Sequence, residues 1–231
     1  MPTVLLIRHG RTAANVSGTL AGWTEGVVLD DAGRAQAAAL ADRLRALPLR
    51  AIVTSPLERT RETAAALLAG REGTPEHVDE RLGEVRYGDW TGQPVKTLAK
   101  DPLWKAVQGH PSSVTFPGGE SMRSMQERAV SAVREWNARL GEDATWAAVS
   151  HGDVIKAVAA DALGLHLDQF QRIQVDPCSV TVIRYTQLRP FVIRLNDVGG
   201  SFEGLLPPKP GRRRRGGSRS SDAVVGGGAG A

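Results

Sequence analysis

A continuous apolar run near the start of the chain, Val4 to Ile7, ends directly on three polar or flexible residues, Arg8, His9 and Gly10. An uninterrupted apolar run predicts a strand covered on both faces, because a half-exposed strand alternates polar and apolar residues. A buried strand that ends on an arginine and a histidine places both side chains at an edge of its sheet. The sequence therefore predicts a layered fold with polar chemistry where its first strand ends.

The same order, a short strand followed at once by polar residues and a helix, recurs twice. The segment "AIVTSPLERTRETAAALL" predicts a strand at residues 51–53 and a helix with Ser55 as its N-cap and Pro56 in the first helical position. The segment "TWAAVS" predicts another strand, and "HGDVIKAVAADALG" predicts the helix that follows it. Strands that alternate with helices indicate an α/β domain.

Two further segments complete the predicted fold. Helical spacing runs from Ala35 to Leu47, with Asp30 and Asp31 available to cap the start. Near the end, "SVTVIRY" and "PFVIRLN" alternate and predict an antiparallel hairpin at one side of the sheet. We therefore expect a three-layer α/β sandwich over residues 1–198, with a mostly parallel central sheet, helices on both faces and an antiparallel edge strand.

Residues 199–231 differ in composition from the rest of the chain. Their glycines, prolines and arginines lack apolar periodicity, so we expect a disordered tail. Residues 201–231 carry six basic and two acidic side chains, so the whole formal charge of +4 lies there and the domain is neutral. The four consecutive arginines predict at most a weak contact with nucleic acid, and a solvated charge run is the simpler interpretation.

The compartment and the membrane topology follow from two simple features. Cys178 is the single cysteine, which excludes an internal disulfide and suits a reducing cytoplasm. The first apolar run is about five residues long, far short of the roughly 20 that a membrane span needs. We expect a cytoplasmic protein without a membrane segment.

Three polar clusters share one predicted position, just past the carboxyl end of a strand. They are Arg8 to Gly10, Ser55 to Arg59, and Ser150 to Gly152. Ligands of open α/β sheets bind at this edge, so the three clusters are expected to converge on one crevice.

The residue types in this crevice favour phosphate chemistry. Arg8 and Arg59 supply fixed forks of donors that suit a tetrahedral oxyanion, and Arg59 belongs to the first turn of its helix. A neutral imidazole is a competent nucleophile, and His9 has His151 near it. Phosphoryl transfer needs an aligned nucleophile and neutralised equatorial oxygens, which these residues supply.

Release of an alkoxide from phosphorus also requires a proton donor. The stretch "RLGEVRYGDWTG" offers Glu84 beside glycines and Trp90, where burial would raise the pKa of a carboxyl group. The nearby acids Glu80 and Asp89 stay open as alternatives.

A metal site is a competing interpretation of the two histidines. His9, His151, Asp153 and Glu84 can be drawn as ligands, but no pair occurs at ligand spacing, and two arginines would repel a cation. Glycine fingerprints of nucleotide-binding loops are absent as well. We expect neither a metal nor a cofactor.

Four motifs stand in the order and approximate spacing of a known family: "LLIRHGRTAAN", "SPLERTRETA", L-x-E-x-x-x-G-x-W-x-G from Leu82 to Gly92, and "VSHGDVI". Over residues 3–197 the chain resembles the phosphoglycerate-mutase-like branch of the histidine phosphatase superfamily. It is similar to an actinobacterial subgroup often labelled probable phosphomutase. The fold of this family often forms dimers, so the resemblance leaves a homodimer open.

The resemblance implies a role for each matching residue. It implies a phosphohistidine on His9, a phosphate pocket of Arg8, Arg59 and His151, and Glu84 as proton donor and then as base toward water. It also implies phosphoryl or substrate contacts for a set of neighbouring residues: Asn15, Ala21, Gly22 and Gly152.

Three departures from the family pattern favour a phosphatase over a mutase. Arg11 stands where the family commonly has Glu or Gln, and Asp153 stands where glycolytic mutases have Asn. The segment from Gly92 to Phe116 is shorter than in those mutases. We therefore expect a metal-independent phosphomonoesterase acting on a small phosphorylated metabolite, with a phosphoglycerate-type phosphomutase as the alternative and a tail-mediated binding module as the second alternative.

Overall fold

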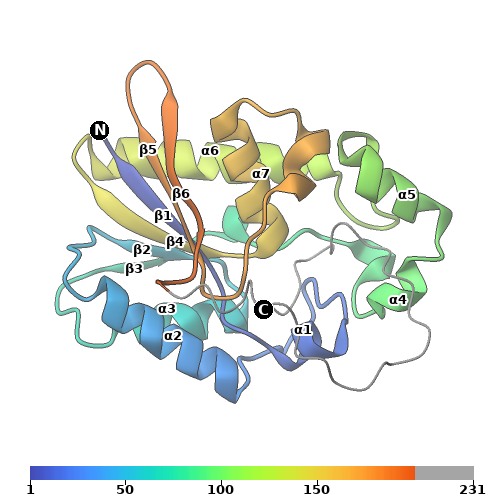
Figure 1. Ribbon diagram of the computed structural model, residues 1–231, viewed down its shortest axis with the longest axis horizontal. Coiled ribbons are helices and arrows are strands. Elements are labelled where there is room, and N and C mark those ends of the chain that lie inside the picture. The colour runs from blue at the N-terminus through green and yellow to red at the C-terminus, as the bar shows by residue number, and fades with distance from the viewer. Residues whose placement is uncertain (201–231) are drawn as a thin grey trace.

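One mixed sheet of six strands, in the order β3-β2-β4-β1-β5-β6, forms the centre of the computed structural model, which describes residues 1–200 (Figure 1). The strands are β1 Thr3–Arg8, β2 Ile52–Thr54, β3 Glu76–Val78, β4 Thr145–Ser150, β5 Val180–Tyr185 and β6 Pro190–Asp197. Strands β3, β2, β4 and β1 pair in parallel, and β5 is antiparallel to both β1 and β6. The predicted α/β class is confirmed, with β5 inside the sheet and β6 at its edge.

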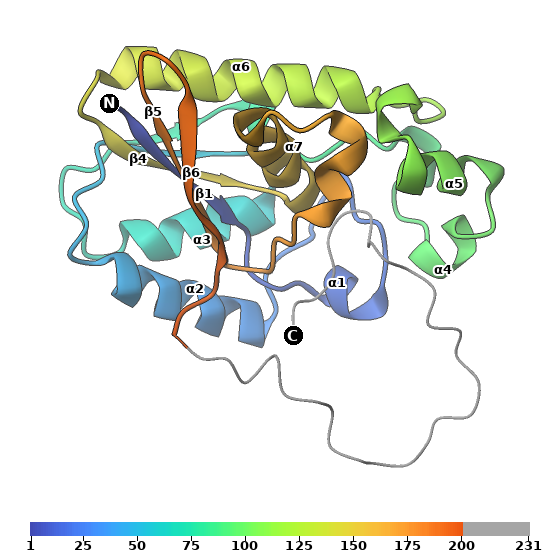
Figure 2. The ribbon, with the colours of Figure 1, turned by 45° about the horizontal axis from the view of Figure 1, so that its top comes forward.

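Helices cover both faces of this sheet (Figure 2). The α-helices are α1 Ala13–Ser17, α2 Asp31–Leu44, α3 Glu58–Leu68, α4 Val95–Leu98, α5 Pro102–Gly109, α6 Met122–Leu140 and α7 Gly152–Leu163. Helices α2 and α3 pack together on one face, where Leu40 and Leu67 join the core. Helices α6 and α7 pack on the other face, where Val133 and Ile155 join a second core. This arrangement gives the three layers that the sequence predicts.

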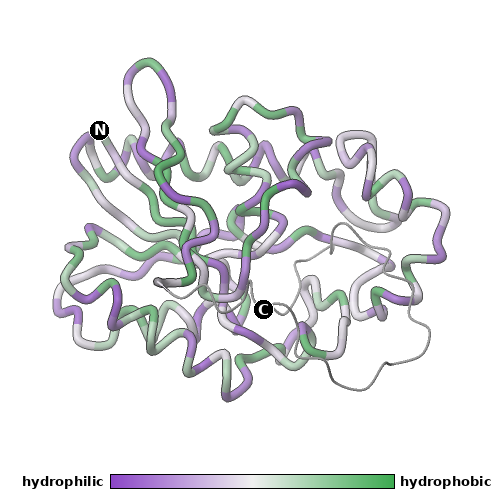
Figure 3. Tube along the Cα trace, viewed as in Figure 1, coloured by the Kyte–Doolittle hydropathy of each residue, from purple (hydrophilic) through white to green (hydrophobic). Residues whose placement is uncertain are grey.

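Helix α2 begins where the sequence predicts. Asp30 is its N-cap, and its carboxylate accepts a hydrogen bond from the Gly33 N–H at 2.7 Å. Hydrophobic and hydrophilic stretches alternate along this helix, as expected for a helix with one face on a sheet (Figure 3). The helix ends at Leu44, three residues earlier than expected, because the chain turns there to enter β2.

The predicted N-cap of α3 is wrong. The helix begins at Glu58 with Leu57 as its N-cap, so Pro56 precedes the helix. The hydroxyl of Ser55 lies 2.8 Å from the Nε2 atom of His151, and this contact takes the place of a cap. A Ser-Pro pair after a strand therefore marks a turn here, and the turn delivers Ser55 to another strand end.

The glycine after His9 has a packing role. A Cβ atom added to Gly10 would lie 2.6 Å from the carbonyl oxygen of Gly33. The Gly10 N–H donates to the hydroxyl of Thr63 at 3.0 Å. The close neighbour that requires a glycine at this position is the first turn of α2.

Short helices fill the segment between β3 and α6. The 3₁₀-helices are η1 Glu80–Leu82, η2 Gly88–Trp90, η3 Pro111–Ser113 and, later in the chain, η4 Leu167–Arg172. Helices α4 and α5 lie on the opposite side of the molecule from the β5–β6 hairpin (Figure 1). Trp90 and Trp104 stack with ring centroids 6.0 Å apart, which attaches this segment to the core.

The predicted tail, residues 199–231, lies outside the described residues from position 201 onward. Within residues 1–200, no helix is both long and apolar enough to cross a membrane.

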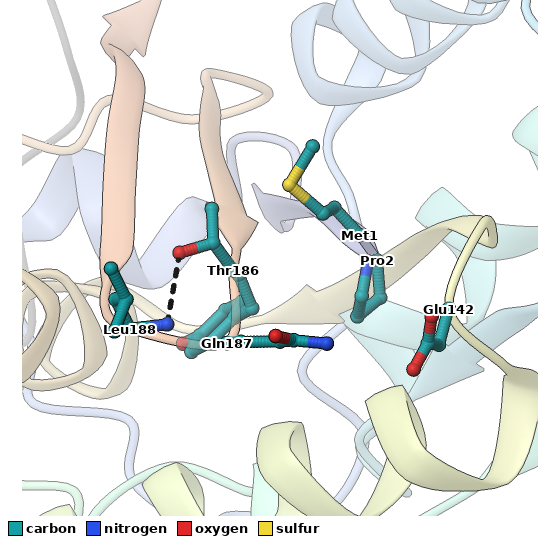
Figure 4. Close-up of a pocket in the computed structure, with 7 residues that line it drawn as sticks. Met1, Pro2, Glu142, Thr186, Gln187 and Leu188 are labelled. Atoms are coloured by element: carbon teal, nitrogen blue, oxygen red, sulfur yellow. Dashed lines mark hydrogen bonds between the residues drawn. The ribbon is translucent and has the colours of Figure 1, made fainter.

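A hollow of about 520 Å³ lies beside the β5–β6 turn (Figure 4). It is lined by Met1, Pro2, Glu142, Tyr185, Thr186, Gln187 and Leu188. Met1 and Pro2 precede β1, so the hollow lies at the opposite end of that strand from Arg8 and His9. It contains none of the predicted site residues.

Candidate active site

The carboxyl ends of three neighbouring strands meet at one edge of the sheet. In the parallel pair β1 and β4, Arg8 lies opposite Ser150. The His9 N–H donates to the Ser150 carbonyl at 3.0 Å, and the Ser55 N–H donates to the Val149 carbonyl at 3.0 Å. The three polar clusters therefore converge, as predicted, because backbone hydrogen bonds join the residues that follow β1, β2 and β4.

Two buried histidine rings lie side by side at this edge. The ring centroids of His9 and His151 are 5.3 Å apart. Burial, with the nearby charges of Arg59 and Arg8, holds the pKa of His9 well below its ordinary value. Burial, then Arg59, does the same to the pKa of His151. Both rings are therefore neutral at neutral pH.

A hydrogen bond fixes the tautomer of His9. The Nδ1 atom of His9 lies 2.7 Å from the Gly10 carbonyl, which can only accept, so Nδ1 carries the proton and Nε2 keeps its lone pair. The Ser55 hydroxyl accepts from the Leu57 N–H at 3.4 Å and lies 2.8 Å from Nε2 of His151. A hydroxyl that donates to Nε2 leaves the proton of His151 on Nδ1.

Two guanidinium groups are buried beside these rings. Arg8 is 0% exposed and Arg59 is 2% exposed. Nη1 of Arg8 donates to the Val175 carbonyl and Nη2 of Arg59 to the Gly22 carbonyl, each at 2.8 Å. Burial lowers the pKa of both groups, and the nearby Glu84 opposes this effect. Buried cations require a partner of opposite charge, so the pair is suited to an anion.

Two buried nitrogen atoms among the predicted site residues lack a partner. Within residues 1–200, Nη1 of Arg59 and Nδ1 of His151 have no hydrogen-bond partner. Buried polar atoms are normally paired. Both atoms belong to residues that the sequence assigns to the phosphate pocket.

Glu84 is a buried acid at this site. It lies two residues after η1 and is 3% exposed, and its Oε1 atom accepts from the Val85 N–H at 3.0 Å. Burial, followed by the charge of Asp153, raises the pKa of Glu84 to about 7. Of the two alternatives, the Glu80 side chain is 76% exposed and faces Arg86, and Asp89 precedes Trp90 in η2. Glu84 therefore has the environment of a general acid.

The loop residues predicted to contact substrate have structural partners as well. Gly22 adopts a φ of 51°, and its carbonyl accepts from Arg59. The carbonyl of Ala21 accepts from the Thr24 N–H, and Oδ1 of Asn15 accepts from the Thr12 N–H in a capping box of α1. Their predicted substrate contacts stay predictions.

Gly152 is the first residue of α7 and is buried. The N-terminus of this helix, which carries partial positive charge, directly follows His151. The predicted phosphate contact of Gly152 stays a prediction.

The two charge departures from the family pattern have different surroundings from those expected. Arg11 forms an ion pair with Asp30 at 2.8 Å, so its charge is neutralised by the cap of α2. Asp153 accepts from the Tyr87 hydroxyl at 3.0 Å and lies 3.6 Å from Nζ of Lys156. Both side chains therefore have partners within the fold.

Sequence reasoning missed three functional partners. Ser55 contacts Nε2 of His151, the Tyr87 hydroxyl donates to Asp153, and Trp23 donates to the Glu84 carbonyl at 2.6 Å. The position of Ser55 directly after a strand was the sequence signal that could have identified it as a site residue. The other two depend on contacts between distant segments that no local pattern marks.

Across the part of the chain that the structure describes, no three side chains of His, Cys, Asp or Glu are grouped as a metal site would need. The fold and the site describe a phosphoryl-transfer enzyme of the α/β class.

Comparison with known proteins makes this more specific. Residues 4–198 match the Histidine phosphatase superfamily (branch 1), and the chain belongs to this family. Over 175 residues, covering 72% of this chain and 76% of the relative, it is 33% identical to the glucosyl-3-phosphoglycerate phosphatase of Mycolicibacterium vanbaalenii. It is 30% identical to the probable phosphoglycerate mutase GpmB of Erwinia tasmaniensis over 81% of this chain and 86% of that one.

A solved structure agrees in fold. Bacillus stearothermophilus YhfR superposes with a TM-score of 0.80 at 33% identity, covering 86% of this chain and 98% of that one. Phosphatases and mutase-like proteins thus both stand among the relatives of this enzyme.

Proposed function

We propose that this enzyme hydrolyses phosphate monoesters of small metabolites through a phosphohistidine on His9. The observation that carries the proposal is the neutral His9 ring, with Nδ1 bonded to the Gly10 carbonyl, beside two buried guanidinium groups. Nε2 then holds the lone pair that attacks phosphorus, and the Gly10 carbonyl stabilises the positive ring that results.

The first half-reaction breaks the ester bond. Nε2 of His9 bonds to phosphorus as the P–O ester bond breaks, and the proton of Glu84 passes to the leaving oxygen. Arg8, Arg59 and His151 donate to the equatorial oxygens, where negative charge is held in the transition state.

The second half-reaction reverses the role of Glu84. The carboxylate takes a proton from water as the water oxygen attacks phosphorus and the P–N bond breaks. Phosphate leaves, His9 is neutral again, and Glu84 is again protonated.

The test is phosphate release from a panel of monoesters in the presence of EDTA, together with rapid quenching of the enzyme during turnover. We expect hydrolysis of phosphoserine, 3-phosphoglycerate or glucosyl-3-phosphoglycerate, and an acid-labile, alkali-stable phosphoenzyme. Interconversion of 2- and 3-phosphoglycerate faster than phosphate release would instead establish the phosphomutase alternative, which the GpmB relative represents. Loss of all hydrolysis in EDTA would contradict the proposal.

The pH dependence of kcat/KM should report Glu84. Only the protonated acid can protonate the leaving group, and its pKa is raised to about 7, so kcat/KM for an alkyl phosphate should fall as pH rises above this value. In Asp153→Asn a neighbouring negative charge is lost, the pKa of Glu84 falls, and the alkaline limb should move to lower pH.

Asp161→Asn is the matched control for this change. Asp161 lies on the same helix, α7, but pairs with Arg134 at 3.0 Å. Its pH profile should coincide with that of the unmodified enzyme. An alkaline limb that moves equally in both variants, or in neither, would show that Asp153 does not act on Glu84.

A further inference from the structure

A side chain from outside the segment that carries Glu84 holds this segment through hydrogen bonds to its backbone carbonyls. We name residues 81–86 the acid loop. Arg128 of α6 donates from Nη1 to the carbonyls of Arg81, at 2.7 Å, and Gly83, at 2.9 Å. Nη2 of the same guanidinium donates to the Glu84 carbonyl at 3.0 Å. One side chain from another layer of the fold therefore bonds three carbonyls across four consecutive residues.

Glu120 holds this guanidinium in place. Its carboxylate accepts from Nε of Arg128 at 3.0 Å and from Nη2 at 2.6 Å. The Glu120 backbone N–H donates to the Arg86 carbonyl, and Oε1 accepts from the Arg86 N–H, both at 2.8 Å. Both side chains are largely buried, at 19% and 14% exposed. We name Arg128 and Glu120 the clamp.

All the hydrogen-bonding capacity of Arg128 is directed at this loop and at Glu120. A guanidinium has five N–H donors in a fixed fork, and five hydrogen bonds from Arg128 are accounted for by the three carbonyls and the carboxylate. A lysine in this position would present a point charge and could not reach the same set of acceptors.

Two neighbours complete the support of the loop. Ser150, at the end of β4, donates to the Leu82 carbonyl at 2.6 Å, and Trp23 donates to the Glu84 carbonyl. The acid loop is thus tied to the strand end that precedes His151. Its position relative to the phosphate pocket is therefore set by side chains outside the loop.

We propose that Arg128, held by Glu120, is a positioning residue that fixes the carboxyl group of Glu84 in line with the leaving oxygen. This inference rests on the proposed role of Glu84 as the acid. Proton transfer requires heavy atoms roughly 2.6–3.2 Å apart, and a displacement of about 1 Å can reduce a rate about 10²-fold. The clamp does not contact phosphate through any bond described for it. The charge of Arg128 also lowers the pKa of His151, but burial is the largest cause of that shift, so the main effect of the clamp should fall on the step that needs the proton.

The test compares leaving groups. Arg128→Met keeps the length of the side chain and removes its donors. For an alkyl phosphate, whose alkoxide needs a proton, we expect kcat/KM to fall about 10–100-fold. For dinitrophenyl phosphate, whose phenolate leaves without a proton, we expect a change under about 2-fold. The ratio kcat/KM is used because it excludes the later hydrolysis of the phosphoenzyme.

A double variant identifies the residue through which Arg128 acts. Glu84→Gln should show the same selective loss on the alkyl ester. Adding Arg128→Met to Glu84→Gln should then cost under about 2-fold more, because residues that act as one unit are not additive. Arg134→Met on the same helix, whose side chain pairs with Asp161, should leave both substrates unaffected.

The outcomes separate the inference from the function on which it rests. An equal loss on both substrates in Arg128→Met, or an undiminished loss in the Glu84→Gln background, would overturn the positioning role while leaving the acid role of Glu84 intact. A Glu84→Gln variant without leaving-group selectivity would overturn the acid role itself, and the clamp with it. If Arg128→Met does not fold, Glu120→Gln, which weakens the clamp from its other side, should show the same selectivity at smaller size, and uniform loss there would overturn the inference.

Discussion

Replacing His9 with alanine is expected to reduce kcat/KM for every phosphate monoester by at least ~10⁴-fold, because the variant lacks the proposed nucleophile. The methyl group that replaces the ring cannot accept a phosphoryl group. The phosphoenzyme that we expect on rapid quenching of the unmodified enzyme should therefore be absent. Phosphate release assays and quenched-flow labelling measure the two effects.

A matched control is His110→Ala. The His110 side chain is 79% exposed and lies 3.7 Å from Asp168, at a different part of the molecule. It should retain full activity and the full yield of phosphoenzyme. Activity of His9→Ala within tenfold of the unmodified enzyme would rule out a nucleophilic role for His9.

The second large effect is expected for Arg59→Met. The variant removes a buried donor whose Nη1 atom, within residues 1–200, has no other partner. Loss of one preorganised donor to a transition-state oxyanion typically costs about 10²–10³-fold in rate. The methionine fills the space of the arginine stem, and the repulsion between two buried guanidinium groups is removed, so the variant should fold. Steady-state kinetics should show a lower kcat and a higher KM.

Arg61→Met gives the comparison on the same helix. The Arg61 side chain is 46% exposed and pairs with Glu76 at 2.9 Å, as a solvated helix residue would. This variant should keep kcat/KM within about 2-fold and change the free energy of unfolding by less than ~1 kcal/mol, because exposed ion pairs contribute little. Equal losses in Arg59→Met and Arg61→Met would indicate a general effect of charge on α3 and not a phosphate contact.

The sequence predicts the convergence of the site because that convergence depends on strand direction alone. Parallel strands place their carboxyl ends together, so Arg8, His9 and His151 could be brought to one edge without any knowledge of side-chain packing. Glu84 was identified through its motif, and its burial agrees with the acid role. Local sequence patterns are therefore sufficient to predict these residues.

Other features could not be predicted because they depend on contacts made only in the fold. Strand β3 is three residues long and partly exposed, so it carries no alternating pattern that identifies it. Arg128 lies on a long amphipathic helix, where the sequence alone predicts an exposed arginine. Its contact with the acid loop forms only in the folded protein. The pairing of Arg11 with Asp30 likewise depends on how the segment after β1 meets α2.

The position of β1 in the sheet has a consequence for the synthesis of the protein. Strand β1, which directly precedes His9, is made well before its two neighbours in the sheet, β4 and β5, which lie at residues 145–150 and 180–185. During most of translation β1 has neither partner, and its core from Val4 to Ile7 is an apolar segment of the kind that pairs with other chains when exposed. This apolar strand therefore stays without its sheet partners until the last third of the domain has been made.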